Sequence, residues 1–198
     1  YGFACFGECD ESDLITNDGA EVGDLLFLTK PLGAGSITTG VKRDVAKKID
    51  VDSAVAGMIR LNDTAARAMK AAEVKAATDI TGFGLIGHAF NIARASNVEL
   101  RFSASAIPLY DGALDLAKQG VISGASSRGR DIYGPNATIN ADVPQELADI
   151  CFDAETSGGL LVCVHPDNVD AFSGSLGAHD LFVQIGEVVA GSSRVSLV

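Results

Sequence analysis

A polar, glycine-rich turn constrains the fold of this chain more than any other feature. It lies at residues 78–88 and reads Thr-Asp-Ile-Thr-Gly-Phe-Gly-Leu-Ile-Gly-His. The apolar pattern of residues 74–80 predicts a strand before the turn, and the pattern of residues 82–95 predicts a helix after it. The glycines have G-x-G-x-x-G spacing, which brings backbone N–H groups close to a bound phosphate. A strand that enters a helix through such a turn requires an architecture in which helices pack against a sheet.

Three interpretations of this turn remain open from the residues alone. In a dinucleotide site, the glycines would contact the pyrophosphate and Glu99 the ribose. Against this, Asp79 would repel a pyrophosphate, and Glu99 lies in the first half of its predicted strand. In a metal–phosphate site, Asp79 would hold Mg²⁺, and N–H groups at the helix start would assist. In the structural alternative, Asp79 or Thr81 only caps the helix.

Strand and helix patterns alternate along the chain, which predicts an α/β or α+β fold. The predicted strands are residues 24–29, 74–80, 97–103, 159–164 and 182–190, with residues 194–198 pairing with the last of them. The predicted helices are residues 36–43, 51–72, 82–95, 109–118, 144–150 and 167–176. The longest of them carries an apolar stripe, formed by Ala54, Met58, Leu61, Ala65 and Met69.

Two segments lie outside this pattern. Residues 123–140 are rich in Gly, Ser and Arg and predict a long loop, in which Arg128 and Arg130 could hold an anion. Residues 1–22 are interpreted as the end of a preceding domain followed by a polar linker. The main domain is therefore expected at residues 23–198.

The charge balance excludes one class of partner and raises a question about another. The 198 residues include 26 acidic and 15 basic side chains, and the formal net charge is −11. Such a surplus repels nucleic acid backbones, so a nucleic acid partner is not expected. An anionic substrate would need a recruited cation, for which a divalent metal is suited. No apolar run reaches the ~18 residues that a membrane span needs.

The four cysteines do not indicate a metal site or a disulfide framework. Cys5 and Cys9 have no partners at zinc-ligand spacing, and Cys151 and Cys163 lie in apolar runs typical of buried thiols. This usage fits a reduced, cytoplasmic compartment.

A second glycine turn, at residues 152–161, follows the sequence Phe-Asp-Ala-Glu-Thr-Ser-Gly-Gly-Leu-Leu. Thr156 and Ser157 offer hydroxyl groups, and the two glycines that follow allow close approach of the backbone before a buried strand. The residues alone favour a plain tight turn over a phosphate or nucleotide contact. His88, in the first turn, is interpreted as a partly buried histidine with satisfied hydrogen bonds.

Several motifs together resemble one family. The segment at residues 78–88 resembles the signature T-D-[VI]-T-G-F-G-L-x-G-H of selenophosphate synthetase (selenide, water dikinase). Residues 28–35 resemble L-T-K-P-L-G-[TS]-G, residues 58–62 resemble M-x-x-L-N, and residues 152–161 resemble F-D-P-Q-T-S-G-G-L-L. The chain departs from the pattern where Asp-Ala-Glu replaces D-P-Q, and where the loop at residues 122–130 lacks Pro and one Gly of P-G-G-[ST].

The resemblance implies a fold and a reaction. The fold would be a mixed β-sheet flanked by helices, like the C-terminal domain of aminoimidazole ribonucleotide synthetase. The family makes selenophosphate from selenide, ATP and water, and releases AMP and orthophosphate. Its catalytic Cys or selenocysteine and its Lys belong to an N-terminal domain that also forms a homodimer. No catalytic residue is therefore expected in this chain, which alone would be inactive and monomeric.

The resemblance also assigns candidate site residues. Asp79 is expected to bind Mg²⁺ together with ATP. The candidate nucleotide and phosphate ligands are Thr81, Gly82, Thr156, Ser157 and Gly158. A non-catalytic nucleotide-binding or regulatory module remains the alternative function.

Overall fold

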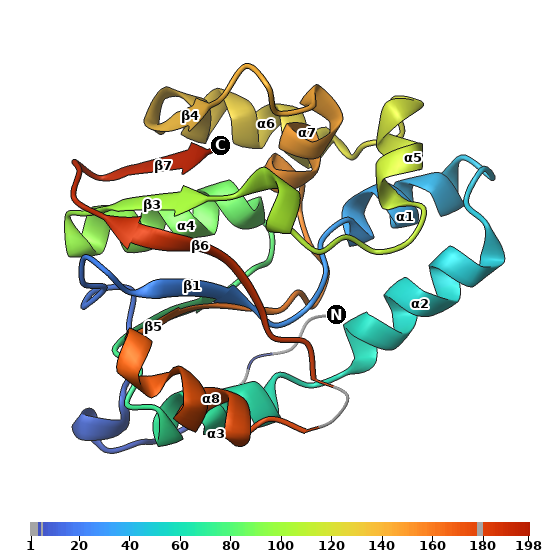
Figure 1. Cartoon of the computed structure of the whole chain (residues 1–198). Coiled ribbons are helices and arrows are strands. Elements are labelled where there is room, and N and C mark those ends of the chain that lie inside the picture. Colours follow the sequence, from blue (N-terminus) through green and yellow to red (C-terminus); the bar gives the residue numbers. More distant parts are fainter. Residues whose placement is uncertain (1–3, 5, 178–179) are drawn as a thin grey trace.

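The computed structural model describes residues 4, 6–177 and 180–198 (Figure 1). These residues form a seven-stranded sheet with the strand order β2-β5-β1-β6-β3-β7-β4. The strands are β1 (Leu25–Leu28), β2 (Ala76–Asp79), β3 (Glu99–Phe102), β4 (Ala137–Ile139), β5 (Leu160–Val164), β6 (Val183–Val189) and β7 (Arg194–Leu197). Tyr1 to Phe3 and Cys5 lie outside the described residues, and the expected domain division stays a prediction.

The sheet is mixed, as the sequence predicts. Neighbouring strands from β2 to β3 in the sheet order are antiparallel, whereas β7 pairs in parallel with both β3 and β4. The prediction that residues 194–198 pair with the preceding strand is wrong. Both sides of β6 are already occupied by β1 and β3, so the last strand extends the sheet beyond β3 instead.

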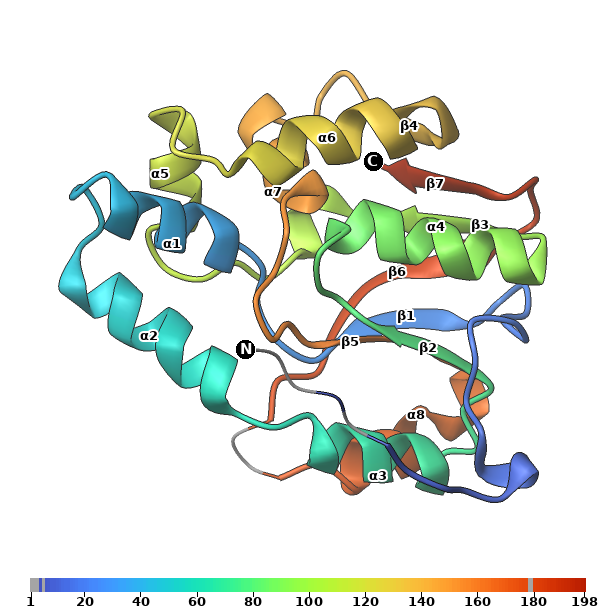
Figure 2. The same cartoon turned by 180° about the vertical axis from the view of Figure 1, so that it is seen from behind.

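Helices cover both faces of the sheet (Figures 1 and 2). They are α1 (Ala34–Lys42), α2 (Lys48–Ile59), α3 (Asp63–Ala71), α4 (Gly84–Ser96), α5 (Ala113–Lys118), α6 (Gly124–Tyr133), α7 (Gln145–Phe152) and α8 (Val169–Gly174). Short 3-10 helices span Glu11–Asp13, Ala104–Ala106, Gly134–Asn136 and Pro166–Asn168. No helix in the described part of the chain combines the length and apolar character that crossing a membrane requires.

Alternation along the central strands produces two hydrophobic cores. Leu26 and Leu28 of β1 point into the core under α1, α4, α5 and α7, whereas Phe27 points into the core under α3 and α8. Phe27 stacks on Phe182 with ring centroids 3.9 Å apart, and Phe172 of α8 also stacks on Phe182, with centroids 4.8 Å apart. Successive side chains of a strand point to opposite faces, so a strand that is apolar throughout must be covered on both sides.

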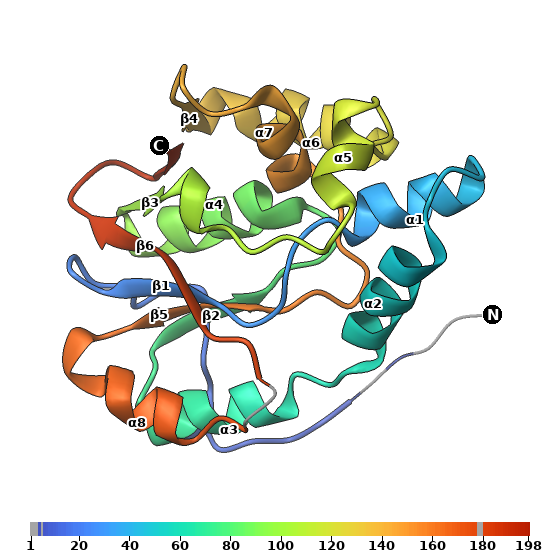
Figure 3. The same ribbon diagram turned by 45° about the vertical axis from the view of Figure 1, so that its right-hand side comes forward.

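The long helix predicted over residues 51–72 is wrong, because the structure has two helices there (Figure 3). Arg60 leaves helical geometry with φ −69° and ψ 128°, and Leu61, assigned to the apolar stripe, is 75% exposed. Instead of continuing a helix, the carbonyl of Arg60 accepts a hydrogen bond from Nζ of Lys30 (N···O 2.7 Å). A tertiary contact thus overrides a local pattern that favours one continuous helix.

The long loop predicted over residues 123–140 is also wrong. Most of it is helix α6, whose first turn is capped by the Ser123 side chain, and its end forms strand β4. Arg130 forms an ion pair with Asp149 and lies over the ring of Phe152, 4.8 Å from its centroid. The guanidinium of Arg130 therefore ties α6 to α7, in place of the anion contact considered for it.

Candidate functional site

The two glycine-rich turns meet at one end of the sheet. Strand β2 runs antiparallel to β5, with Asp79 opposite Leu160, so the turn after β2 and the turn before β5 are neighbours. The N–H of Ile80 donates to the carbonyl of Gly159 (N···O 2.8 Å), and the N–H of Glu155 donates to the carbonyl of Thr81 (3.0 Å). Two segments that the sequence places more than seventy residues apart therefore form one surface.

Most of the predicted site residues point away from the core on this surface. Asp79, Gly82, Thr156 and Ser157 are exposed, Thr81 is half-buried, and Gly158 is buried between the turns. The side chains of Asp79, Thr156 and Ser157 form no hydrogen bond with any residue in the described ranges. Their carboxylate and hydroxyl oxygens are exposed at the surface.

This donor set fits one kind of metal site. Within the described residues, three or more His, Cys, Asp or Glu side chains do not come together as a complete metal cage. Mg²⁺ does not need one, because it keeps several waters and is held by one or two carboxylates together with substrate phosphates. A single exposed carboxylate beside hydroxyl groups suits that mode of binding, and would not suit a structural zinc site.

His88 organises the first turn from within. Its Nε2 accepts hydrogen bonds from the N–H groups of Thr81 (N···N 3.1 Å) and Phe83 (3.3 Å). Nε2 must therefore be unprotonated, and burial lowers the pKa of His88, which favours the neutral ring. The interpretation of His88 as a satisfied, buried histidine is confirmed. Because the N–H groups of Thr81 and Phe83 are bound to His88, neither of them is available to a ligand.

Two alternative interpretations of the first turn are wrong. Helix α4 begins after Phe83, and no side chain caps it, so neither Asp79 nor Thr81 has the capping role. A dinucleotide fold would place the strands on either side of the helix as parallel neighbours. Here β5, β1 and β6 separate β2 from β3, and Glu99 accepts a hydrogen bond from the hydroxyl of Ser196 (O···O 2.7 Å).

Glu155 connects the two glycine-rich turns to a third segment, the turn that precedes α1. Its carboxylate accepts hydrogen bonds from the N–H groups of Gly33 (N···O 2.6 Å) and Ala34 (3.0 Å), at the N-terminus of α1. Burial raises the pKa of Glu155 to about 8, although these two N–H groups act in the opposite direction. The sequence shows Glu155 only as a departure from a family motif, so the residue's structural role was missed.

The wild type is expected to lose stability as pH rises, and replacing Glu155 by glutamine is expected to remove this loss. The folded chain holds a proton on Glu155 up to a pKa of about 8, against an ordinary value of 4.5, so the stability contributed by this group is present at low pH and lost as pH rises. Between those values the wild type should lose roughly 1.4 kcal/mol of unfolding free energy per pH unit relative to Glu155→Gln.

Urea unfolding at about pH 5 and about pH 8 measures this difference. The matched control is Glu8→Gln at an exposed position, which should follow the wild type at both pH values. Identical pH profiles for the wild type and Glu155→Gln would contradict the prediction.

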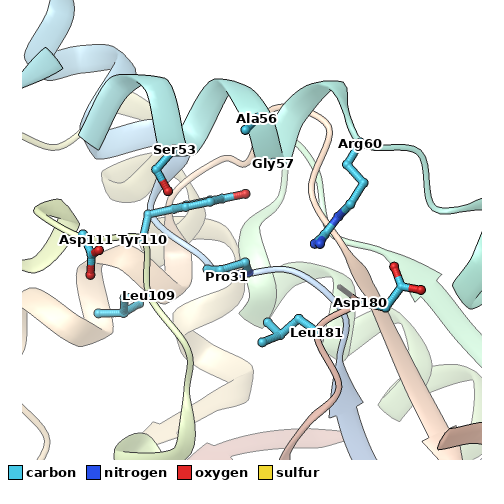
Figure 4. A pocket seen from close by; sticks show the side chains of 10 residues that line it. All are labelled: Pro31, Ser53, Ala56, Gly57, Arg60, Leu109, Tyr110, Asp111, Asp180 and Leu181. Carbon is cyan, nitrogen blue, oxygen red and sulfur yellow. The ribbon is translucent and has the colours of Figure 1, made fainter. Parts of the chain in front are cut away.

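A cavity of about 560 Å³ lies along α2, with Arg60 at one side of it (Figure 4). It opens between α2 and the segment before β6, and it is lined by Pro31, Ser53, Ala56, Gly57, Arg60, Leu109, Tyr110, Asp111, Asp180 and Leu181. The Tyr110 ring lies so close to Gly57 that a side chain at position 57 would overlap it. None of the predicted site residues lines this cavity.

The comparison with protein families decides where the chain belongs. The family model described as AIR synthase related protein, C-terminal domain, matches residues 21–198. The chain belongs to this family. The described fold, with its mixed sheet and helices on both faces, is the fold of the family, as the sequence predicts.

Relatives within this family carry a specific name. A selenide, water dikinase of Geobacter metallireducens is 38% identical over 190 residues, which make up 96% of this chain and 55% of that protein. A selenide, water dikinase of Paraburkholderia xenovorans is 37% identical over 201 residues, which make up 100% of this chain and 56% of that protein. The resemblance to selenophosphate synthetases is confirmed as homology, and the chain spans about half the length of these curated relatives.

The solved structures share the fold at lower sequence identity. The crystal structure of thiamine-monophosphate kinase from Stenotrophomonas maltophilia K279a matches with a TM-score of 0.65 and 19% identity. The match covers 92% of this chain and 52% of that one. It shows that this chain shares its fold with part of that kinase.

Proposed function

We propose that this chain is the C-terminal part of a selenide, water dikinase, which makes selenophosphate from selenide, ATP and water and releases AMP and orthophosphate. One observation carries the proposal. The two turns that carry the family motifs are hydrogen-bonded to each other, and Asp79, Thr156 and Ser157 are exposed on the surface they form. Homology to selenide, water dikinases along nearly the whole chain supports the assignment.

The chemistry of this surface suits the phosphates of ATP. The hydroxyls of Thr156 and Ser157 and the N–H of Gly82 would donate hydrogen bonds to phosphate oxygens, and Gly158 would hold the two turns at the distance that this requires. Asp79 would hold Mg²⁺, which when bound neutralises charge between phosphate oxygens. This arrangement answers the problem set by a net charge of −11, because the acidic chain recruits the cation that an anionic substrate needs. A hydrogenase maturation protein HypE in complex with ATP has the same fold, with a TM-score of 0.61.

The nucleophile would come from outside the described residues. Neither Cys5 nor Cys9 matches the catalytic position of the family motif. Burial raises the pKa of both Cys151 and Cys163, so neither of these buried thiols forms a thiolate readily. The chain is therefore proposed to contribute phosphate and metal contacts in the cytoplasm, within a homodimer formed through an N-terminal domain. By itself the chain would be a monomer that does not catalyse the reaction.

Calorimetry on the purified chain tests the proposal. We expect ATP to bind in the presence of Mg²⁺ and to bind at least roughly tenfold more weakly when the metal is chelated, because one carboxylate cannot hold phosphates without it. The same chain should release no AMP when supplied with selenide and Mg·ATP. Nucleotide binding that is indifferent to Mg²⁺ would contradict the role of Asp79, and selenide-dependent AMP release would contradict the absence of a nucleophile.

A further inference from the structure

The side chain of Lys30 is buried without an acidic partner. Only 1% of the residue is exposed, and Nζ donates hydrogen bonds to the carbonyls of Ser157 (N···O 2.8 Å) and Arg60 (2.7 Å). No carboxylate among the described residues forms an ion pair with it. Burial lowers the pKa of Lys30, and the positive charge of Arg60 lowers it further, to a smaller extent. A buried cation of this kind is unfavourable unless something compensates it.

The turn at residues 156–159 is held by side chains on its inner side. Lys30 binds the carbonyl of Ser157, and the amide nitrogen of Asn62 donates to the next carbonyl, that of Gly158 (N···O 3.0 Å). The N–H of Leu160 then donates to the hydroxyl of Thr29 (N···O 2.8 Å). Ser157 has a φ of +52°, a left-handed conformation that a residue other than glycine adopts only when its surroundings impose it.

The interruption between α2 and α3 serves this turn. Because the chain leaves helical geometry at Arg60, the carbonyl of Arg60 reaches Lys30 and the side chain of Asn62 reaches Gly158. Figure 4 shows Arg60 at the end of α2, with its guanidinium directed into the neighbouring cavity. A second positive charge thus lies next to Lys30, at the same end of an otherwise acidic chain.

We propose that Lys30 and Asn62 are positioning residues, which hold the turn at residues 156–159 in its binding conformation, and that the charge of Lys30 stabilises a phosphate-class anion bound on the outer side of that turn. The proposal rests on the proposed function, because the anion would be a phosphate group of the nucleotide. It assigns a role to two side chains that contact the turn and not the ligand. A charge fixed in place before binding needs no reorganisation when the anion arrives, so it acts at full strength.

Two variants and one control separate the parts of this proposal. Lys30→Met removes the charge and keeps the length of the side chain, whereas Asn62→Ala releases one carbonyl and keeps the charge. Lys48→Met removes an exposed lysine from α2 and is the matched control. We expect Lys30→Met to weaken Mg·ATP binding by roughly tenfold or more and Asn62→Ala by roughly threefold, while Lys48→Met binds as the wild type does. Wild-type affinity in Lys30→Met would overturn the role of its charge.

Hydrogen exchange of the Leu160 amide provides a readout without ligand. Both Lys30→Met and Asn62→Ala should speed this exchange by roughly tenfold or more, since the amide directly follows the held carbonyls. Unchanged exchange in both variants would overturn the positioning role. If Lys30→Met does not fold, the ¹⁵N resonance of the wild-type Lys30 ammonium must shift on titration with Mg·ATP, and a constant resonance would overturn the role of the charge.

The same measurements distinguish this proposal from the proposed function. If the wild type does not bind Mg·ATP, the proposed function fails for this chain and the role of the Lys30 charge fails with it. The positioning role is then decided by hydrogen exchange alone.

Discussion

Replacing Asp79 by asparagine is expected to lower selenide-dependent AMP release by roughly a thousandfold or more in the complete enzyme, because a neutral amide holds Mg²⁺ and its bound phosphates far less well than a carboxylate. The fold should be unaffected. Asp79 is exposed at the end of β2, and its side chain makes no hydrogen bond to the described residues, so the unfolding free energy should change by no more than roughly 0.5 kcal/mol.

The measurement pairs turnover with Mg²⁺ titration. If Asp79 holds the metal, Asp79→Asn should raise the Mg²⁺ concentration needed for nucleotide binding as well as lower the rate. Asp142→Asn is the matched control, because Asp142 is an exposed aspartate in the segment before α7, away from the two turns. Normal turnover in Asp79→Asn would remove this residue from the proposed mechanism.

Both glycine-rich turns could be located from the sequence, but their pairing could not. A glycine-rich turn after one short strand and another before a second one predict close backbone approach, but the antiparallel pairing of β2 with β5, which brings the turns together, was not predicted. Asp79 was a candidate metal ligand by its residue type, whereas Thr156 and Ser157 became candidate ligands only through the family resemblance. Their roles remain proposals, whereas their placement on one surface is a property of the fold.

What the sequence did not predict depends on contacts between distant segments. Helix α2 ends just before Arg60, and the backbone carbonyl of this residue accepts a hydrogen bond from Lys30. No local propensity encodes that contact. Helix α6 was hidden by its glycines and serines, which favour loops in isolation, yet Ser123 caps it and Arg130 anchors it to α7. Propensity is a weak prior when a segment gains this much tertiary contact.

The buried charges were missed for a related reason. Lys30 and Glu155 appear in the sequence as ordinary polar residues near turns, and burial cannot be read from their type, because both residue types are usually exposed. In the structure each of them binds backbone groups of a turn that the pattern had located, Lys30 through carbonyls and Glu155 through N–H groups. The sequence therefore locates the turns, and the charges that hold them are visible only in three dimensions.

Replacing Gly158 by alanine is expected to destabilise the chain by roughly 3 kcal/mol or more, a large effect for adding one methyl group. A Cβ atom at position 158 would overlap the carbonyl oxygen of Ile80. Ile80 cannot easily yield, because it is fully buried and its N–H donates to the carbonyl of Gly159 (N···O 2.8 Å). Accommodating the methyl group would require β2 and β5 to separate at the point where the two turns meet.

Gly82 provides the matched control on the same surface. Apart from its chain neighbours, no described residue has an atom within 4 Å of the place that a Cβ would take at position 82. Gly82→Ala should therefore change the unfolding free energy by no more than roughly 0.5 kcal/mol. Urea unfolding of both variants, with equal m-values, measures the difference. If Gly158→Ala keeps its stability but loses nucleotide binding, the glycine is required for the approach of the ligand. The contact with Ile80 predicts instead that Gly158→Ala loses stability. Any loss of nucleotide binding would then follow from the separation of the two turns.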